Sequence, residues 1–305
     1  MDLSRLRALR ELSLRRTMAA VAEALHISPS AVSQQISQLE EETGLSLVER
    51  RGRGVKLTPA GDMLVAHAES ILTVLQNART DLAELKRDVA GDLRLAAFSS
   101  AAAILGAVSI KSLEKTHTRL RITLEEIEPN DALTALRAWE SDVALIDDLT
   151  VLSEQIKENI EIAPIARDML YVTLPAEHRL ARRTTIHITD LRSERWALDT
   201  ASSTYTDVIV RMCRAAGFEP EINGMCSSFE ALIAMIEAGC SISILPGMRI
   251  RRTRQEDRKI VFRKLIPETQ RKIFVAYRRG ELRSPKISAL VEVLKASAAM
   301  WNDGV

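Results

Sequence analysis

Cysteine and aromatic residues are scarce in this sequence. It has three cysteines among 305 residues, and Phe, Trp and Tyr together make up 4%. So few cysteines, in an odd number, exclude a disulfide-stapled fold and predict a reducing, cytoplasmic compartment. The longest uncharged run, residues 95–110, is too short to cross a bilayer, so no membrane partner is expected. The arginine-rich start, residues 1–16, has no apolar core and does not fit a secretory signal.

Motifs of catalysis and metal binding are also missing. The five histidines make no H-x-x-x-H pair and no cluster with cysteine, which excludes the usual zinc patterns. The sequence has no Gly-x-Ser-x-Gly elbow and no glycine-rich phosphate loop. We therefore expect no metal, no cofactor and no catalytic residue. An enzyme built on the C-terminal part of the chain stays an alternative, but it leaves the N-terminal motifs described below unexplained.

The composition is that of a globular protein with two domains or more. Apolar residues make up 46% and charged residues 27%, values typical of globular chains. Lys plus Arg number 42 against 41 Asp plus Glu, so the net charge is +1. This near balance neither indicates nor excludes nucleic-acid binding, because the position of charge clusters decides that question.

The pattern of apolar residues changes near residues 90–91. Residues 3–57 predict short helices followed by a basic hairpin, and residues 58–89 predict one long helix. From there, short apolar strands alternate with helices, which is typical of an α/β domain. The predicted strands cover 93–98, 121–127, 143–146, 169–174, 196–198, 242–245 and 273–277, and clear helices cover 131–140, 206–216 and 229–238.

Residues 17–44 predict a helix-turn-helix. Thr17 can cap a first short helix, and after the turn at residues 26–28 Ser28 and Pro29 suit the start of a second, which Gly44 ends. The second helix has an apolar face, with Val32, Ile36 and Leu39, and a face of short polar residues that can reach base edges in a major groove. An ordinary helical hairpin with a solvated face fits the same pattern. The candidate DNA-binding residues of this segment are Ser28, Pro29, Ser30, Ser33 and Gln34.

A basic hairpin at residues 47–57 favours the DNA-binding interpretation. Two short strands flank a tip with glycines, and basic side chains gather there, namely Arg50, Arg51, Arg53 and Lys56. An arginine at a hairpin tip can enter a minor groove while its neighbours contact phosphate. We therefore expect Arg50 and Arg53 to contact DNA, with a solvated basic hairpin as the alternative.

The order of helix, helix-turn-helix, wing and long helix resembles the LysR-type family of bacterial regulators. The resemblance rests on residues 17–22 (TMAAVA), 25–36 (LHISPSAVSQQI), 39–40 (LE), 43–44 (TG) and 57–61 (LTPAG). In that family the counterparts of the polar helix face and of the wing arginine Arg53 approach DNA. Two residues depart from the pattern: Arg16 replaces a usual glycine, and Gln34 stands where arginine is frequent. Gln34 would favour adenine over guanine.

The long helix carries an unbroken heptad seam. Thr58 and Pro59 suit its start, and apolar residues then recur in alternating steps of four and three. Such a seam needs a partner, either the rest of the chain or a second copy. The resemblance implies a dimerisation helix that joins two DNA-binding heads. The seam consists of Leu64, Ala68, Ile71, Leu75, Ala78, Leu82, Leu85 and Val89, and we expect Leu64, Ile71, Leu75, Leu82 and Leu85 to make the dimer contacts.

For the rest of the chain, the resemblance implies a two-lobed α/β domain of the periplasmic-binding-protein type with two crossover strands. The expected organisation is an all-α winged helix-turn-helix at 1–58, a linker helix at 59–90 and an effector-binding domain at 91–305. The first lobe would hold about 92–162 and 268–305, and the second about 163–267.

Polar residues follow three predicted strands of this domain, at the ends where ligands bind in such sheets. Their hydroxyls could hold a small anionic or zwitterionic effector, such as an amino acid or an organic acid, or could serve only as helix caps. Pro129-Asn130, after another strand, leaves the fourth side of such a cleft open. The candidate effector-binding residues are Ser99, Ser100, Thr200, Ser202, Ser227 and Ser228.

Sensing could instead be redox chemistry at Cys213, Cys226 or Cys240, although buried cysteine is commonly just a small apolar residue. The favoured hypothesis is a DNA-binding transcriptional regulator that a small-molecule effector controls. Its expected partners are double-stranded DNA, further copies of the chain in a dimer or tetramer, and RNA polymerase.

Overall fold

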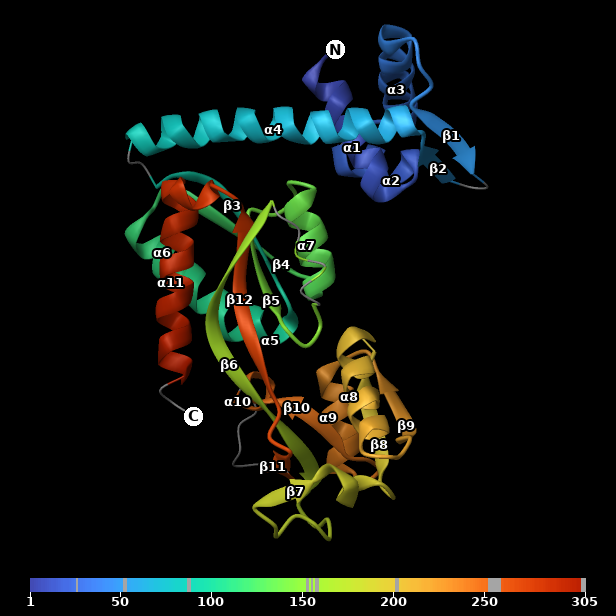
Figure 1. The fold of residues 1–305 in the computed structure, drawn as a ribbon. Helices are drawn as coiled ribbons and strands as arrows, with labels where there is room; N and C mark the ends of the chain where they lie inside the picture. The colour runs from blue at the N-terminus through green and yellow to red at the C-terminus, as the bar shows by residue number, and fades with distance from the viewer. Residues whose placement is uncertain are drawn as a thin grey trace. The chain divides into compact units, whose positions relative to one another are not determined.

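A computed structural model describes residues 1–25, 27–51, 54–86, 89–151, 154, 156, 159–200, 203–251 and 259–302 (Figure 1). The chain divides into two compact units, Met1–Asp88 and Val89–Val305. Within the described ranges, no helix has the length and apolar character needed to cross a membrane.

The first unit is a winged helix-turn-helix followed by a long helix. Its elements are α1 (Leu3–Arg15), α2 (Met18–Leu25), α3 (Pro29–Thr43), β1 (Val48–Arg51), β2 (Gly54–Leu57) and α4 (Pro59–Lys86). The predicted start and end of α3 are confirmed: the Ser28 hydroxyl accepts a hydrogen bond from the Ala31 N–H at 3.2 Å, and Gly44 ends the helix at φ 68°. Thr17 caps α2 through the Ala20 N–H at 3.3 Å.

The core of this unit forms where the apolar faces of its helices meet. Val32, Ile36 and Leu39 of α3 are buried there, as predicted, together with residues of α1 and α2. Glu40, on the same helix, accepts hydrogen bonds from the backbone N–H groups of Leu47 and Val48 at 2.8 and 3.3 Å. The Glu40 carboxylate therefore fixes the base of the wing against α3.

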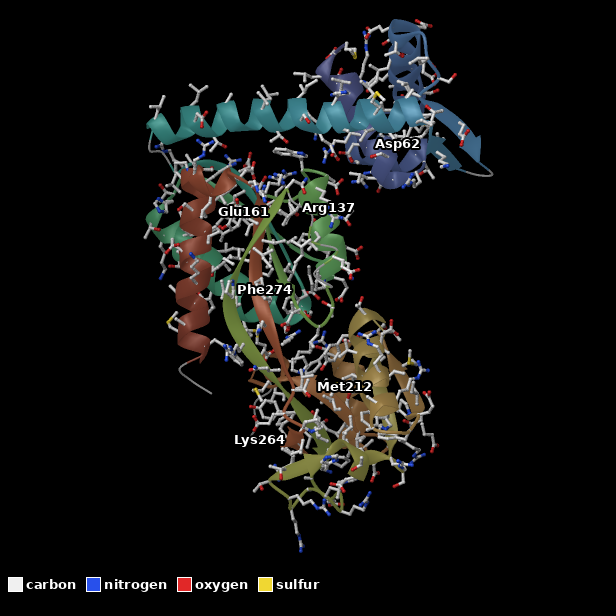
Figure 2. All side chains as sticks on the ribbon, in the orientation of Figure 1. Asp62, Arg137, Glu161, Met212, Lys264 and Phe274 are labelled. Carbon is white, nitrogen blue, oxygen red and sulfur yellow. The ribbon has the colours of Figure 1, made fainter. Side chains whose placement is uncertain are left out.

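The long helix α4 begins as the sequence predicts and ends earlier. Thr58 caps it by accepting from the Gly61 N–H at 3.1 Å, and Asp62 stands in its first turn (Figure 2). A Cβ on Gly61 would collide with the carbonyl oxygen of Leu47, so only glycine lets α4 lie this close to the wing. The described helix ends at Lys86, and Val89 packs against the core of the second unit, so Val89 does not belong to the heptad seam.

The second unit contains a first lobe in which helices cover both faces of a sheet. The strands lie in the order β4 (Leu120–Glu126), β3 (Gly91–Ala97), β5 (Val143–Asp147), β12 (Gln270–Arg278) and β6 (Ile160–Pro175). Alternate residues of β3 face opposite sides, with Leu95 in one apolar core and Ala96 in the other. This double burial explains its nearly continuous apolar sequence. The helical elements are α5 (Ser99–Ala101), η1 (Ala102–Gly106), α6 (Ala107–Thr116), α7 (Pro129–Arg137), η5 (Glu281–Arg283) and α11 (Pro285–Asn302).

The second lobe surrounds the far half of β6, the long strand that Figure 1 shows running through both lobes beside β12. There β6 pairs with β10 (Ser243–Pro246) and β11 (Ile260–Ile266), and β11 pairs with β7 (Thr185–His187). Two further strands, β8 (Arg195–Asp199) and β9 (Glu221–Cys226), are parallel. The helices are η3 (Ile188–Leu191), α8 (Ser203–Ala215), α9 (Phe229–Glu237) and α10 (Gly247–Arg251). The predicted two-lobed α/β architecture, with its two crossover strands, is confirmed.

The turn between α1 and α2 explains the departure at Arg16. Arg16 has φ 64° and ψ −4°, and its N–H donates to the Leu12 carbonyl at 3.0 Å, so it ends α1 in the left-handed conformation. Its carbonyl accepts from the Val55 N–H of the wing at 2.9 Å. The turn therefore keeps the geometry that glycine adopts without steric cost, although a side chain with Cβ occupies it.

We expect Arg16→Gly to raise the free energy of unfolding of the first unit by about 1 kcal/mol, because it relieves left-handed strain. Gly44→Ala, at φ 68° and with open space around the added Cβ, is the converse control. It should lower the free energy of unfolding by about the same amount. Urea unfolding followed by circular dichroism measures both. A stability loss in Arg16→Gly would contradict this account of the turn.

Candidate DNA-binding surface and ligand pocket

The polar face of α3 is open to solvent. Ser28, Pro29, Ser30, Ser33 and Gln34 are all exposed at or near the start of this helix. The hydroxyls of Ser28 and Ser30 lie 2.9 Å apart, and Ser28 also caps the helix. Ser33 and Gln34 lie one turn further along the same exposed face, which does not pack into the core of the first unit.

The wing is an antiparallel hairpin in which Val48 pairs with Leu57 and Arg51 pairs with Gly54. Arg50 lies in β1, but its side chain and the whole of Arg53 fall outside the described residues. Lys56 is exposed on β2. The predicted basic wing therefore has its expected backbone, and the contacts of Arg50 and Arg53 stay predictions.

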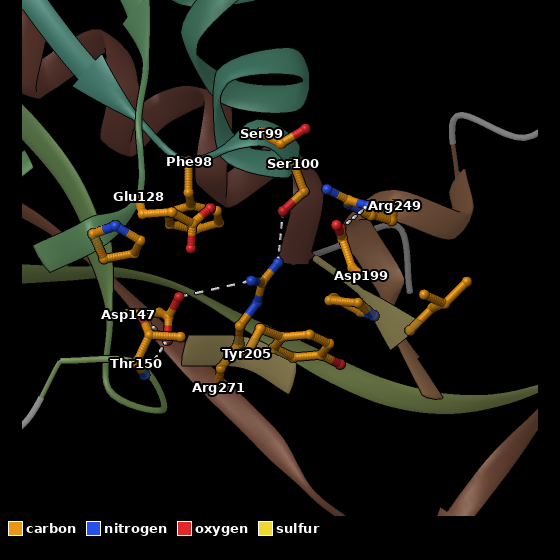
Figure 3. A pocket seen from close by; sticks show the side chains of 13 residues that line it. Phe98, Ser99, Ser100, Glu128, Asp147, Thr150, Asp199, Tyr205, Arg249 and Arg271 are labelled. Carbon is orange, nitrogen blue, oxygen red and sulfur yellow. Dashed lines mark hydrogen bonds and ion pairs between the residues drawn. The ribbon is translucent and has the colours of Figure 1, made fainter. Parts of the chain in front are cut away.

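The second unit has a pocket at the carboxyl ends of several strands (Figure 3). Its residues end or follow β3, β4, β5 and β8, and come from α8, α10, β10 and the crossover strand β12. Segments that are far apart in the sequence thus converge at the edge where ligands bind in open α/β sheets. The lining consists of Phe98, Ser99, Ser100, Glu128, Pro129, Asp147, Thr150, Asp199, Tyr205, Leu245, Pro246, Arg249 and Arg271.

A buried guanidinium, that of Arg271 on β12, lies at the centre of the pocket. Its Nη2 donates to Asp168 Oδ2 at 2.8 Å and to the Ser100 hydroxyl at 2.7 Å, and its Nη1 lies 3.7 Å from Asp147 Oδ2. The group also stacks over the ring of Phe98 at 4.7 Å (Figure 3). Burial by itself lowers the pKa of Arg271, but the carboxylates of Asp168 and Asp147 outweigh it and raise the pKa above its usual value. Arg271 is therefore a permanent cation in the pocket.

A second ion pair and a buried phenol form the opposite wall. Arg249 of α10 donates to Asp199 Oδ2 at 2.8 Å and lies 5.1 Å from the centre of the Phe229 ring. The Tyr205 hydroxyl donates to the Ile244 carbonyl at 3.3 Å, which joins α8 to β10. Burial, the largest cause, raises the pKa of Tyr205 far above its usual value, so its hydroxyl stays a neutral hydrogen-bond donor.

The structure brings together only part of the predicted serine set. Ser99 and Ser100 line the pocket, and Ser202 lies outside the described residues. Thr200 and Ser227 are exposed and do not line this pocket, and Ser228 caps α9 by accepting from the Ala231 N–H at 3.2 Å. Pro129, at the first position of α7, closes the side that the sequence left open.

Sequence reasoning missed the charged residues of the pocket. Asp147 directly follows the predicted strand 143–146, so the rule that selected the serines also applies to it. For Asp168 and Arg271 the available signal was a different one, namely a charged residue next to a predicted apolar strand. Both residues are buried in the structure. They pair directly across β6 and β12.

The three cysteines are free thiols. Cys240 is half-buried, and the surroundings of the buried Cys213 and Cys226 do not favour reactivity. Cys213 is fully buried in the core of the second lobe, where desolvation raises the pKa of its thiol to about 11. Burial also raises the pKa of Cys226. Because the thiolate is the reactive form, both environments oppose peroxide chemistry. In the part of the chain that the structure describes, no three His, Cys, Asp or Glu side chains form a group that could hold a metal ion.

Each of the two units matches a family model of known proteins. Residues 3–62 match the family model described as bacterial regulatory helix-turn-helix protein, lysR family, and residues 86–299 match the LysR substrate binding domain. The transcriptional dual regulator GltC of Bacillus subtilis is 26% identical over 81% of this chain and 81% of its own length. The DNA-binding transcriptional dual regulator OxyR of Escherichia coli is 25% identical over 90% of this chain and 88% of its own length.

Solved structures share the fold. Full-length OxyR from Pseudomonas aeruginosa has a TM-score of 0.68 at 24% identity and covers 98% of this chain and 97% of that one. Full-length CbnR, solved in complex with its target DNA, has a TM-score of 0.55 at 24% identity and covers 98% of this chain and 100% of that one. The family models together span nearly the whole sequence, and the chain belongs to the LysR family of bacterial transcriptional regulators.

Proposed function

We propose that the pocket around Arg271 binds a small effector and that this binding controls how the winged helix-turn-helix engages an operator. The observation that carries the proposal is the origin of the pocket residues. Ser100 and Asp147 belong to the first lobe, Tyr205 and Arg249 to the second, and Arg271 to a strand that crosses between them. A ligand that contacts all three parts favours one lobe arrangement over another. RNA polymerase at the promoter would read the resulting change in the bound DNA.

Ser100→Ala tests this assignment, with Ser227→Ala as the matched control. Thermal-shift screening of amino acids and organic acids with the full chain first identifies a binder. Ser100 is buried and hydrogen-bonded to Arg271, whereas Ser227 is exposed outside the pocket. Ser100→Ala removes a hydroxyl that lines the pocket and orients Arg271, so an effector that uses either group loses about 1–3 kcal/mol, and we expect roughly tenfold weaker binding in that variant alone. Calorimetry measures the affinity, and operator binding checks the fold. Equal affinities in both variants would place the effector elsewhere.

The exposed face of α3 is the proposed base-reading surface. Gln34→Ala should weaken binding to the true operator by about 1–3 kcal/mol and relax preference at one base pair, because a glutamine amide can make two hydrogen bonds to adenine. Gln38→Ala, the same change one turn further from the helix start, should cost less. Electrophoretic mobility shifts on operator and scrambled duplexes measure both. Wild-type affinity of Gln34→Ala for both duplexes would contradict this proposal.

The far part of α4 is the proposed dimer seam. Leu64 packs against the core of the winged helix-turn-helix, and Ala68 is buried in that core. The start of the seam is therefore covered within the first unit itself. Leu75 is half-buried. Further along, large apolar side chains stay exposed on the helix, namely Ile71, Val74, Leu82 and Leu85, with Leu85 exposed to 83%. A helix with such a stripe requires a second apolar surface, and a second α4 supplies one.

Leu82→Asp should therefore give a folded monomer, since the substituted carboxylate is solvated in one chain but would be buried in the pair. Thr73→Asp, at another exposed position of α4, is the control and should stay an oligomer. Light scattering gives the mass of each, and circular dichroism checks helicity. A Leu82→Asp protein with the mass of the wild type would show that α4 does not form the interface.

A further inference from the structure

Among the described residues of the pocket the charge is negative on balance, although two guanidinium groups line it. Each guanidinium already has a carboxylate at 2.8 Å: Asp168 for Arg271 and Asp199 for Arg249. Asp147 and Glu128 add two further carboxylates to the lining, both from the first lobe. Glu128 makes an interaction of its own, so the balance rests on Asp147: with it, three carboxylates stand around two cations, and an added anion meets a net repulsion at short range.

Asp147 is the carboxylate with capacity to bind a ligand. Its side chain is buried, and Oδ1 accepts from the Leu149 N–H, the Thr150 N–H and the Thr150 hydroxyl at 3.0, 2.9 and 3.1 Å. Its Oδ2 faces Arg271 at 3.7 Å, which is longer than a hydrogen bond (Figure 3). Because Arg271 donates to Asp168 and Ser100 instead, this oxygen keeps acceptor capacity on the pocket side.

From this arrangement, and given the effector site proposed above, we infer that the pocket selects small molecules with a protonated amino group. The amino group would donate a hydrogen bond to Asp147 Oδ2. An ammonium donates three hydrogen bonds and offsets the surplus negative charge. A carboxylate on the same molecule is tolerated where the Ser99 hydroxyl lies, but a dianion is not. This narrows the range of amino acids and organic acids expected from the sequence to compounds with an amine.

Three four-carbon compounds test the inference with the full chain: putrescine with two amines, γ-aminobutyrate with one amine and one carboxylate, and succinate with two carboxylates. Calorimetry should show binding of both amines and at least tenfold weaker binding of succinate. Asp147→Asn removes the charge but keeps an Oδ1 acceptor for the turn, and it should weaken both amines roughly tenfold, as loss of a charge-assisted hydrogen bond does. Asp148→Asn is the matched control, because Asp148 is the next residue, is exposed and lies outside the pocket.

Each outcome is decisive for the inference. Tighter binding of succinate than of the amines overturns it, as does undiminished amine affinity in Asp147→Asn. Failure of both amines to bind at millimolar concentration also overturns it. A succinate response that Ser100→Ala removes would leave the proposed effector site standing while rejecting its preference for amines. A response to any probe that is insensitive to Ser100→Ala would reject the site itself.

Discussion

The buried ion pair between Asp168 and Arg271 is the interaction on which the second unit depends. The two residues face each other across β6 and β12, the strands that join the lobes. Asp168 Oδ1 also accepts from the Met248 N–H of α10 at 3.0 Å, and Arg271 reaches Ser100 of α5. A Cβ on Gly247 would lie 2.8 Å from the same Asp168 oxygen, so α10 can approach only with glycine there. One pair thus ties both lobes to their connecting strands.

Such a pair is costly to bury and stays favourable only when its hydrogen bonds are complete. Desolvation opposes both charges, and a buried charge that loses its partner costs about 3–5 kcal/mol. Here the carboxylate has donors from β12 and α10, and the guanidinium has acceptors from β6 and α5, with the face of Phe98 beneath it. Because the Asp168 carboxylate at 2.8 Å offsets the charge of Arg271, the guanidinium organises the pocket without offering a strong anion site. In the proposed effector site, the carboxylates around Arg271 then decide which ligands are selected.

Local signals in the sequence were sufficient for the helices and insufficient for the pocket. Ser28, Pro29 and Gly44 define α3 because capping depends on residues a few positions apart. The pair of Asp168 and Arg271 lies 103 residues apart, and no local rule connects them. The strand-end rule selected Ser99 and Ser100, which line the pocket, and it also selected Ser228, whose hydroxyl caps a helix. A hydroxyl after a strand fits both roles, and only the fold distinguishes them.

A shared fold does not carry a shared sensing chemistry, because sensing depends on a few side chains placed on a common scaffold. This chain is similar to OxyR proteins over nearly its whole length, and the likeness extends to both lobes and the crossover strands. Its own thiols at Cys213 and Cys226 are buried, and their pKa values are raised, which disfavours the thiolate. Polar and charged groups do face an open space around Arg271. Reversible binding of a polar small molecule therefore fits the groups of this pocket, whereas oxidation at Cys213 or Cys226 would require a buried sulfur to ionise against its surroundings.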